Sequence, residues 1–140
     1  MKFSCTQEHL EHALSLVSRV AQRSSNLPIL QNVLVEVTTN GISLAGTNLE
    51  TGIRAKFRGK VEVAGSCTVP AQLFSNYVAL LPADRVDCSY EDKQLHVQSA
   101  NEHSVIKGED SNDFPVLPEI ERQQSYTIER GLLERSLQQT

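Results

Sequence analysis

The stretch "ILQNVLVEVTTNGISLAGT", residues 29–47, has the pattern of a β-hairpin. Its first part, residues 29–37, is rich in β-branched side chains, which favour strands. Asn40-Gly41 is typical of the tight turn between two antiparallel strands, and residues 42–47 are expected to form the returning strand. A hairpin must bury one face against other elements, so the segments on either side decide the fold class.

The segment before the hairpin predicts a short strand, residues 1–5, followed by a helix. Thr6 suits the N-cap and Glu8 the first turn. Apolar residues then recur at helical spacing, and a polar set falls on the opposite side. The apolar set is Leu10, Ala13, Leu14, Val17, Val20 and Ala21, and the polar set is Glu8, Glu11, Ser15, Ser18, Arg19 and Gln22. "SSNLP", residues 24–28, is expected to end the helix.

The segment after the hairpin repeats this arrangement. Residues 51–63 alternate apolar and basic side chains as a half-buried strand does, and Gly65 turns the chain into "SCTVP". Pro70 suits the first turn of a second helix, which Pro82 ends. Its apolar stripe is Leu73, Phe74, Tyr77, Val78 and Leu81. Three strands follow, "RVDCSYE", "QLHVQS" and "HSVIKG".

Two halves of similar plan, each a helix followed by three strands, therefore start about 60 residues apart, as in an internal duplication. The predicted fold class is α+β, with two helices packed on antiparallel sheets. Residues 109–121 carry only acidic charges and two prolines, which indicates an exposed connector.

The bulk properties exclude some classes of protein. The net charge of −4 argues against a generally basic nucleic-acid-binding surface, although it permits a locally positive face. Three widely separated cysteines are typical of a reduced, cytosolic protein, so we expect a cytoplasmic location. No apolar run is long enough to cross a membrane, and the signal-peptide pattern is absent. We expect no membrane partner.

Candidate catalytic groups are few. His9 and His12 could share a helix face and bind a metal, but the sequence suggests no third ligand, so we expect surface histidines and no metal site. Glu109 and Asp110 lie in the connector, where both would be solvated. Cys67 or Cys88 could serve a small hydrolase, but no cysteine has basic neighbours, so burial is expected. The sequence supports neither an enzyme nor a cofactor.

Basic residues are unevenly distributed. Arg19 and Arg23 lie near the end of the first helix, where they could contact phosphates without reading bases. A second set lines one strand and is expected to form a solvated outer face: Arg54, Lys56, Arg58 and Lys60. The second helix has no charged residue, and of its side chains only Gln72, Ser75 and Asn76 could make a weak polar contact with nucleic acid.

Four linked motifs resemble the N-terminal domain of the bacterial DNA polymerase III beta subunits, the sliding clamps. They are "LPILQNVLVEV", "GISLAGTNLE", "TVPAQLFSNYVALLP" and "IKGEDSNDFPVLP". The resemblance runs from Met1 to about Pro118. It implies a clamp domain, three of which make up each chain of a two-chain, head-to-tail ring around duplex DNA. Helices line the hole, sheets form the outer wall, and sequence-independent contact with DNA permits sliding.

The resemblance also implies partners. A ring of this kind is a non-catalytic accessory subunit of the DNA polymerase III holoenzyme, and it makes the polymerase processive. The polymerase III alpha subunit and the clamp loader bind to later domains of a clamp. Our chain, as a clamp N-terminal domain, would not contain that binding pocket.

Site residues follow position by position from the same resemblance. Arg23 is the counterpart of a DNA-contacting arginine, although it stands one residue further from Leu27 than usual, and Arg19 is its neighbour. Gln72 and Asn76 stand where many clamps carry basic residues. Residues 102–108 correspond to the edge that pairs with the neighbouring chain. The interface residues are His103, Ser104, Val105, Ile106 and Lys107. Some clamps have a large aromatic residue at position 104, so the apolar contact here would rest on Val105 or Ile106.

The C-terminal "YTIERGLLERSLQQT", residues 126–140, echoes "FSCTQEHLEHAL", residues 3–14. Tyr126 falls on Phe3 and Leu133 on Leu10. The resemblance explains this echo as the first strand and helix of a second domain, beginning at Tyr126. We therefore expect residues 1–120 to be one domain and 121–140 to be a linker and a truncated start of the next. This last segment is expected to fray. The alternative function is a stand-alone protein-interaction module that pairs through an exposed edge strand.

Overall fold

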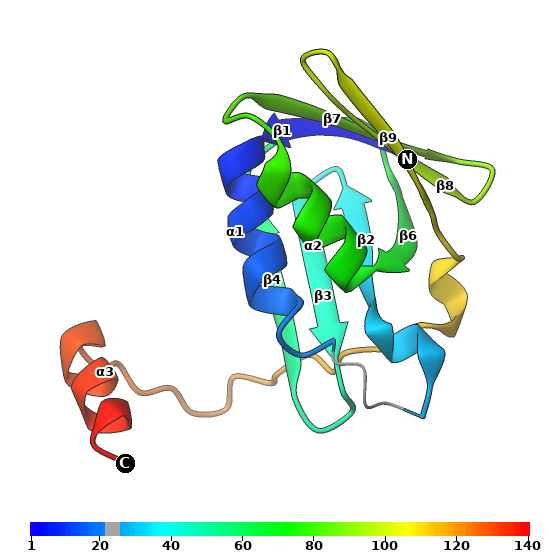
Figure 1. Cartoon of the computed structure of the whole chain (residues 1–140). Coiled ribbons are helices and arrows are strands. Elements are labelled where there is room, and N and C mark those ends of the chain that lie inside the picture. The colour runs from blue at the N-terminus through cyan, green and yellow to red at the C-terminus, as the bar shows by residue number, and fades with distance from the viewer. Residues whose placement is uncertain (22–25) are drawn as a thin grey trace.

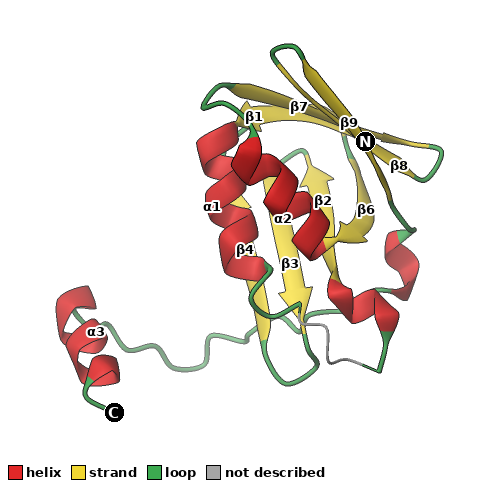
Figure 2. Cartoon of the chain, viewed as in Figure 1, coloured by secondary structure: helices red, strands yellow, loops and turns green. Residues whose placement is uncertain are grey.

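Two antiparallel sheets and two helices form the body of the protein in the computed structural model, which describes residues 1–21 and 26–140 (Figures 1 and 2). The first sheet has the order β5-β1-β7-β8-β9. Its strands are β5 (Lys60–Val63), β1 (Lys2–Thr6), β7 (Arg85–Glu91), β8 (Gln94–Ser99) and β9 (Glu102–Lys107). The second sheet has the order β4-β3-β2-β6. Its strands are β4 (Gly52–Phe57), β3 (Gly41–Thr47), β2 (Asn32–Thr38) and β6 (Gly65–Pro70).

The duplication predicted from the sequence is visible in the order of these strands. Each half contributes one three-stranded meander, β2-β3-β4 or β7-β8-β9. The strand that precedes the helix of the other half completes the sheet: β1 pairs with β7, and β6 pairs with β2, both antiparallel. Neither sheet is therefore built from one half alone. The α+β class and the packing of two helices on antiparallel sheets are confirmed.

The opening hairpin forms between β2 and β3, with Thr38 opposite Gly41. Gly41 has a φ of +137°, a conformation that glycine adopts at little cost. The Thr38 hydroxyl accepts a hydrogen bond from the Asn40 N–H at 3.2 Å, which fastens the turn. The strand begins later than predicted, because Pro28–Gln31 is a 3₁₀ helix and β2 starts at Asn32.

The first helix, α1 (Gln7–Val17), starts where the sequence predicts. The Thr6 hydroxyl oxygen accepts a hydrogen bond from the His9 N–H at 3.3 Å. The helix ends at Val17, earlier than expected. A Cβ atom at Gly46 would lie 2.7 Å from the Val17 carbonyl oxygen, so the last turn packs directly onto β3. Ser18 is buried there, contrary to its place in the predicted polar set.

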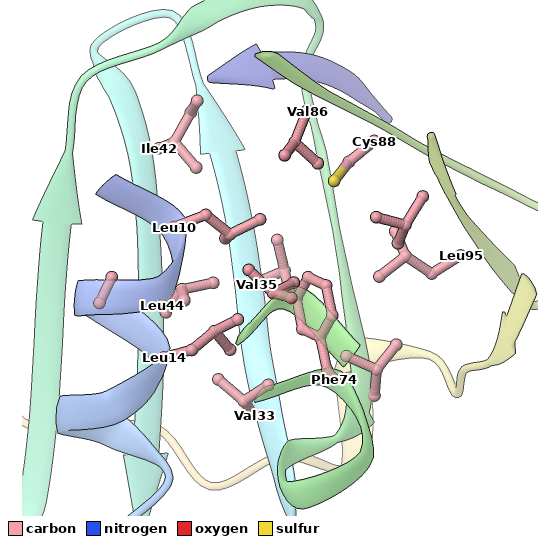
Figure 3. Close-up of a cluster of buried hydrophobic side chains, with 14 of the residues drawn as sticks. Leu10, Leu14, Val33, Val35, Ile42, Leu44, Phe74, Val86, Cys88 and Leu95 are labelled. Carbon is pink, nitrogen blue, oxygen red and sulfur yellow. The ribbon is translucent and has the colours of Figure 1, made fainter. Parts of the chain in front are cut away.

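The core lies between the helices and the inner faces of both sheets (Figure 3). Leu10 and Leu14 of α1 meet Val35 and Leu44 of the hairpin, and Phe74 of α2 (Ala71–Leu80) fills the space toward the other sheet. The predicted stripe of α2 is correct for its buried members Phe74, Val78 and Leu81. It is wrong for Leu73, which is 56% exposed because the helix turns that flank away from both sheets.

The predicted strand 51–63 is two strands. The chain leaves the second sheet after β4 and joins the first sheet as β5, which pairs with β1. The crossing occurs at Gly59, where a Cβ atom would lie 2.5 Å from the Ser4 carbonyl oxygen. The alternation within β4 is as predicted, with Ile53, Ala55 and Phe57 half-buried against the core.

The connector is less exposed than its composition indicates. Thr68 and Glu109 form a β-bridge, and the η2 turn (Ser111–Asp113) follows. Phe114 is 6% exposed and packs on Leu34 and Ala45, on the outer face of the second sheet, and Leu117 is partly buried beside them. The segment up to Leu117 therefore belongs to the folded domain.

The C-terminal segment extends away from this body and ends in α3 (Arg130–Gln138) (Figure 1). No buried side chain is found in α3. Its first residue, Arg130, is the counterpart of Gln7 in the alignment of the echo, so the helix starts at the equivalent position. The strand expected from Tyr126 is not formed, because among the described residues no other strand pairs with this segment.

We expect Phe114→Ala to lower the free energy of unfolding by about 3 kcal/mol, since it removes the central side chain of the outer cluster. Urea denaturation of the 140-residue chain measures this change. Val116→Ala is the matched control: Val116 is 92% exposed in the same connector, so its loss should change stability by no more than about 0.5 kcal/mol. Equal small effects of the two substitutions would show that the connector does not pack on the domain.

Candidate functional site

The two helices lie side by side on one side of the domain (Figure 1). Gln7, at the start of α1, is buried, and its amide Nε2 donates a hydrogen bond to the Val78 carbonyl oxygen of α2 at 2.9 Å. The Gln7 N–H donates to the Asp84 carbonyl oxygen at 2.8 Å. These contacts fasten the start of α1 to the second half of α2. The sequence offered no signal for them beyond a glutamine beside the cap.

The predicted polar contacts of α2 are in reach of a ligand. Gln72 and Asn76 are both exposed and lie four residues apart, on one side of the helix. No charged residue stands between Ala71 and Ala83. Leu73 and Leu80 are 56% and 83% exposed, so much of the accessible surface of α2 is apolar. This helix can contact a polyanion only through neutral hydrogen bonds.

Of the two arginines predicted to contact DNA, only Arg19 belongs to the described residues. Arg19 is exposed, two residues beyond the helix. Arg23 lies outside the described residues. Arg19 is thus the basic side chain of this predicted pair that the structure places on the helix side of the domain.

Strand β9 forms one edge of the first sheet and pairs only with β8 in the described part of the chain. This position is the one predicted for residues 102–108. Ile106 is 3% exposed and belongs to the domain's own core, whereas Val105 is 45% exposed. Of these two candidates, Val105 therefore has the side chain that a docking strand can reach. His103 and Lys107, also predicted here, are exposed, and Ser104 is half-buried.

A contact between α2 and β9 was not predicted. Since Ile106 points into the core, Ser104, two residues earlier, lies on the same inner face of the sheet. Tyr77 of α2 lies close enough to this strand for its side chains to affect the tyrosine hydroxyl. Burial raises the pKa of Tyr77, the nearby Glu102 carboxylate raises it further, and the Ser104 side chain lowers it.

The outer face of the same edge carries two histidines. His96 of β8 and His103 of β9 lie with their ring centroids 5.5 Å apart, and His96 Nδ1 is 3.3 Å from His103 Nε2. Nearby polar residues are already paired: Arg85 with Asp87 at 2.8 Å and Lys2 with Glu62 at 3.1 Å. No group of three metal-ligating side chains occurs among the described residues.

The basic residues of the outer strand point away from the helices. Arg54 and Lys56 of β4 are exposed, as is Arg58 just after it, and the Arg54 guanidinium lies 3.8 Å from the Glu36 carboxylate. They flank the free edge of the second sheet, where charged side chains discourage unwanted pairing.

The candidate catalytic groups do not form a site in the described ranges, 1–21 and 26–140. His9 and His12 are both exposed on α1. Glu109 is exposed and uses its backbone in the bridge to Thr68, and Asp110 is exposed beside Lys93. All three cysteines are buried, as predicted. Burial raises the pKa of both Cys5 and Cys67 to about 12, and it raises that of Cys88 well above the ordinary value. Such thiols are inert at neutral pH, so the hydrolase hypothesis has no support.

The family described as "DNA polymerase III beta subunit, N-terminal domain" matches residues 1–118. The chain belongs to the DNA polymerase III beta subunit family. The resemblance predicted from the four motifs is thereby confirmed. No described helix of this beta-subunit domain is both long enough and apolar enough to span a bilayer.

Relatives and solved structures agree with this assignment. The beta sliding clamp of Synechococcus elongatus is 34% identical over the whole chain, and that of Pseudomonas putida is 31% identical. The crystal structure of a putative DNA polymerase III beta subunit from Eubacterium rectale superposes with a TM-score of 0.95 at 26% identity, over 100% of this chain. The chain spans 38% of the Synechococcus protein and 39% of the Eubacterium chain.

The buried thiols predict slow alkylation. With iodoacetamide at pH 8, the native 140-residue chain should react far more slowly than the unfolded chain, because the folded pKa of Cys5 and Cys67 is about 12. The folded state favours the neutral thiols of Cys5 and Cys67. Their contribution to the free energy of unfolding should therefore be constant below pH 9 and should fall as the pH rises from 9 toward 12. Mass spectrometry with and without urea counts the modified cysteines. Rapid labelling of Cys67 or Cys88 in the native chain would contradict their burial.

Proposed function

We propose that this domain is part of a DNA sliding clamp, a ring that holds the replicative polymerase on duplex DNA. The observation that carries the proposal is the combination of a paired-helix surface with a free edge strand, in a chain whose residues 1–118 match the beta-subunit family. A ring needs both features in each domain: a surface toward DNA and an edge that continues into the next domain. The clamp acts by topology and has no catalytic step of its own.

The proposed DNA contact is weak because few of its side chains are charged. Arg19, two residues beyond α1, would supply positive charge, as would Arg23, which lies outside the described residues. Gln72 and Asn76 would add neutral hydrogen bonds from α2. Contacts of this kind go to phosphates, so they hold the duplex without reading its sequence. Because α2 has no charged residue, little electrostatic attraction opposes movement along the duplex.

The proposed subunit contact uses β9. An unpaired edge strand offers N–H and C=O groups to another chain, and strand addition satisfies them. A second clamp chain would pair head to tail with residues 103–107, and Val105 would supply the exposed apolar side chain. The same edge supports the alternative, a module that pairs with an unrelated protein, and the ring experiment below separates the two.

The remaining partners depend on the parts of a clamp outside this domain. The polymerase III alpha subunit and the clamp loader would bind to later domains, so the protein would be an accessory subunit of the holoenzyme in the cytoplasm. Residues 1–120 would form the first domain, and 121–140 the linker and the start of the second.

The ring predicts retention on closed DNA only. The full-length gene product, placed on nicked circular duplex DNA by a clamp loader and ATP, should remain bound during gel filtration in moderate salt. Cutting the circle with a restriction enzyme should release it, since a ring slides off a free end. Equal retention on circular and linear DNA would contradict the ring and favour the alternative module.

The helix-end arginines predict a change in salt dependence. In the full-length protein, Arg19→Gln and Arg23→Gln should each weaken DNA binding equally for all sequences and reduce the slope of log affinity against log salt by about 1. Fluorescence anisotropy with primed duplexes measures both quantities. Arg58→Gln is the matched control: Arg58 is exposed just after β4, and its replacement should leave the slope unchanged. A larger change in slope for Arg58→Gln than for Arg19→Gln and Arg23→Gln would contradict this proposal and indicate that DNA contacts the outer strand instead.

A further inference from the structure

His96 of β8 and His103 of β9 lie on the same face of the first sheet. Gln98 is directly opposite His103, and it shares a face with His96 because the two stand two residues apart in β8. The histidines are therefore diagonal neighbours across the hairpin, a separation that large side chains can bridge. The register of β8 and β9 thus brings together two imidazole rings that are seven residues apart in the sequence.

The facing ring nitrogens have a separation that suits one shared metal ion. His96 Nδ1 is 3.3 Å from His103 Nε2, and the ring planes differ by 15°. Two nitrogen ligands of a tetrahedral Zn²⁺, each bound at about 2.0 to 2.1 Å, lie about 3.3 Å apart. Without a metal, one of the two nitrogens donates its proton to the other. Because a histidine ring turns easily about its last side-chain bond, both lone pairs can face one ion once that proton moves to the other nitrogen of its own ring.

A polar hollow of about 400 Å³ opens beside the two rings. The Lys2 ammonium is paired with the Glu62 carboxylate at 3.1 Å, and the Arg85 guanidinium is paired with the Asp87 carboxylate at 2.8 Å. The charges of the lining therefore cancel, and a divalent cation meets no net repulsion there. Water can enter the hollow and fill the coordination positions that the histidines leave open. Besides the histidines, the lining residues are Lys2, Glu62, Arg85, Asp87, Ser89 and Gln98.

We propose that His96 and His103 bind one divalent transition metal ion of the Zn²⁺ class, which links β8 to β9. Imidazole suits Zn²⁺, Cu²⁺ and Ni²⁺, whereas Mg²⁺ and Ca²⁺ prefer oxygen ligands. Two protein ligands are fewer than the four of a structural zinc site, so the ion binds reversibly and adds to the stability of a hairpin that folds without it. The inference does not depend on the ring, because both ligands belong to one domain.

The test is a calorimetric titration of the 140-residue chain, carrying no histidine tag, with ZnCl₂ near neutral pH. We expect one bound ion per chain and no binding of MgCl₂. His96→Gln and His103→Gln should each weaken Zn²⁺ binding by about tenfold or more, since replacing even a group that only supports a ligand costs that much. Unchanged affinity in these two variants, or no binding to the unaltered chain, would overturn the proposal.

The chain supplies its own control in its other two histidines. His9 and His12 are exposed on α1, three residues apart, so they test whether any close pair of surface histidines is enough. His9→Gln with His12→Gln should leave the Zn²⁺ affinity within about twofold, because the facing nitrogens of β8 and β9 are untouched. Loss of binding in this double variant would place the ion on α1 and contradict the proposal.

Stability gives a second measurement. Zn²⁺ should raise the free energy of unfolding of the unaltered chain more than that of His96→Gln, because an ion held by the folded state stabilises it. Urea denaturation without Zn²⁺ checks that each variant folds. An equal gain in the unaltered chain and in His96→Gln would show that the ion binds elsewhere.

Discussion

The exchange of strands between the two halves is the constraint on which the rest of the structure depends. β1 bonds to β7 and β6 bonds to β2, so each sheet contains strands from both halves. Residues far apart in the sequence must meet before either sheet is complete, which makes the domain one cooperative unit. The same exchange sets the helices, because each follows the strand that the other half's meander binds. Gln7 of α1 then reaches the Val78 carbonyl oxygen of α2.

From this arrangement come the two surfaces on which the proposed function depends. The paired helices share one side of the domain, with Arg19 near its end and neutral side chains along α2. The meander β7-β8-β9 ends in an edge strand, β9. The helix surface offers side chains to a partner, whereas this strand offers backbone N–H and C=O groups.

Local patterns predicted much of the fold because local physics decides those elements. The Thr6 cap, the Asn40-Gly41 turn and the alternation of β4 each depend on neighbours in sequence, and each is present. Most of the errors lie where distant contacts decide the structure. α1 stops at Val17 against Gly46, the predicted strand 51–63 divides at Gly59 beside Ser4, and the polar connector is anchored by Phe114 on the hairpin. Tyr126 begins no strand, since a strand requires a partner.

The sequence by itself determined the duplicated α+β plan, the burial of the three cysteines and membership of the clamp family, because periodicity, composition and linked motifs carry that information. It also identified the residues of the edge strand. Only the tertiary structure decided which of them are accessible: Ile106 is enclosed by the domain's own core, whereas Val105 remains exposed. Accessibility depends on what packs above a side chain, and those neighbours come from the other half of the chain.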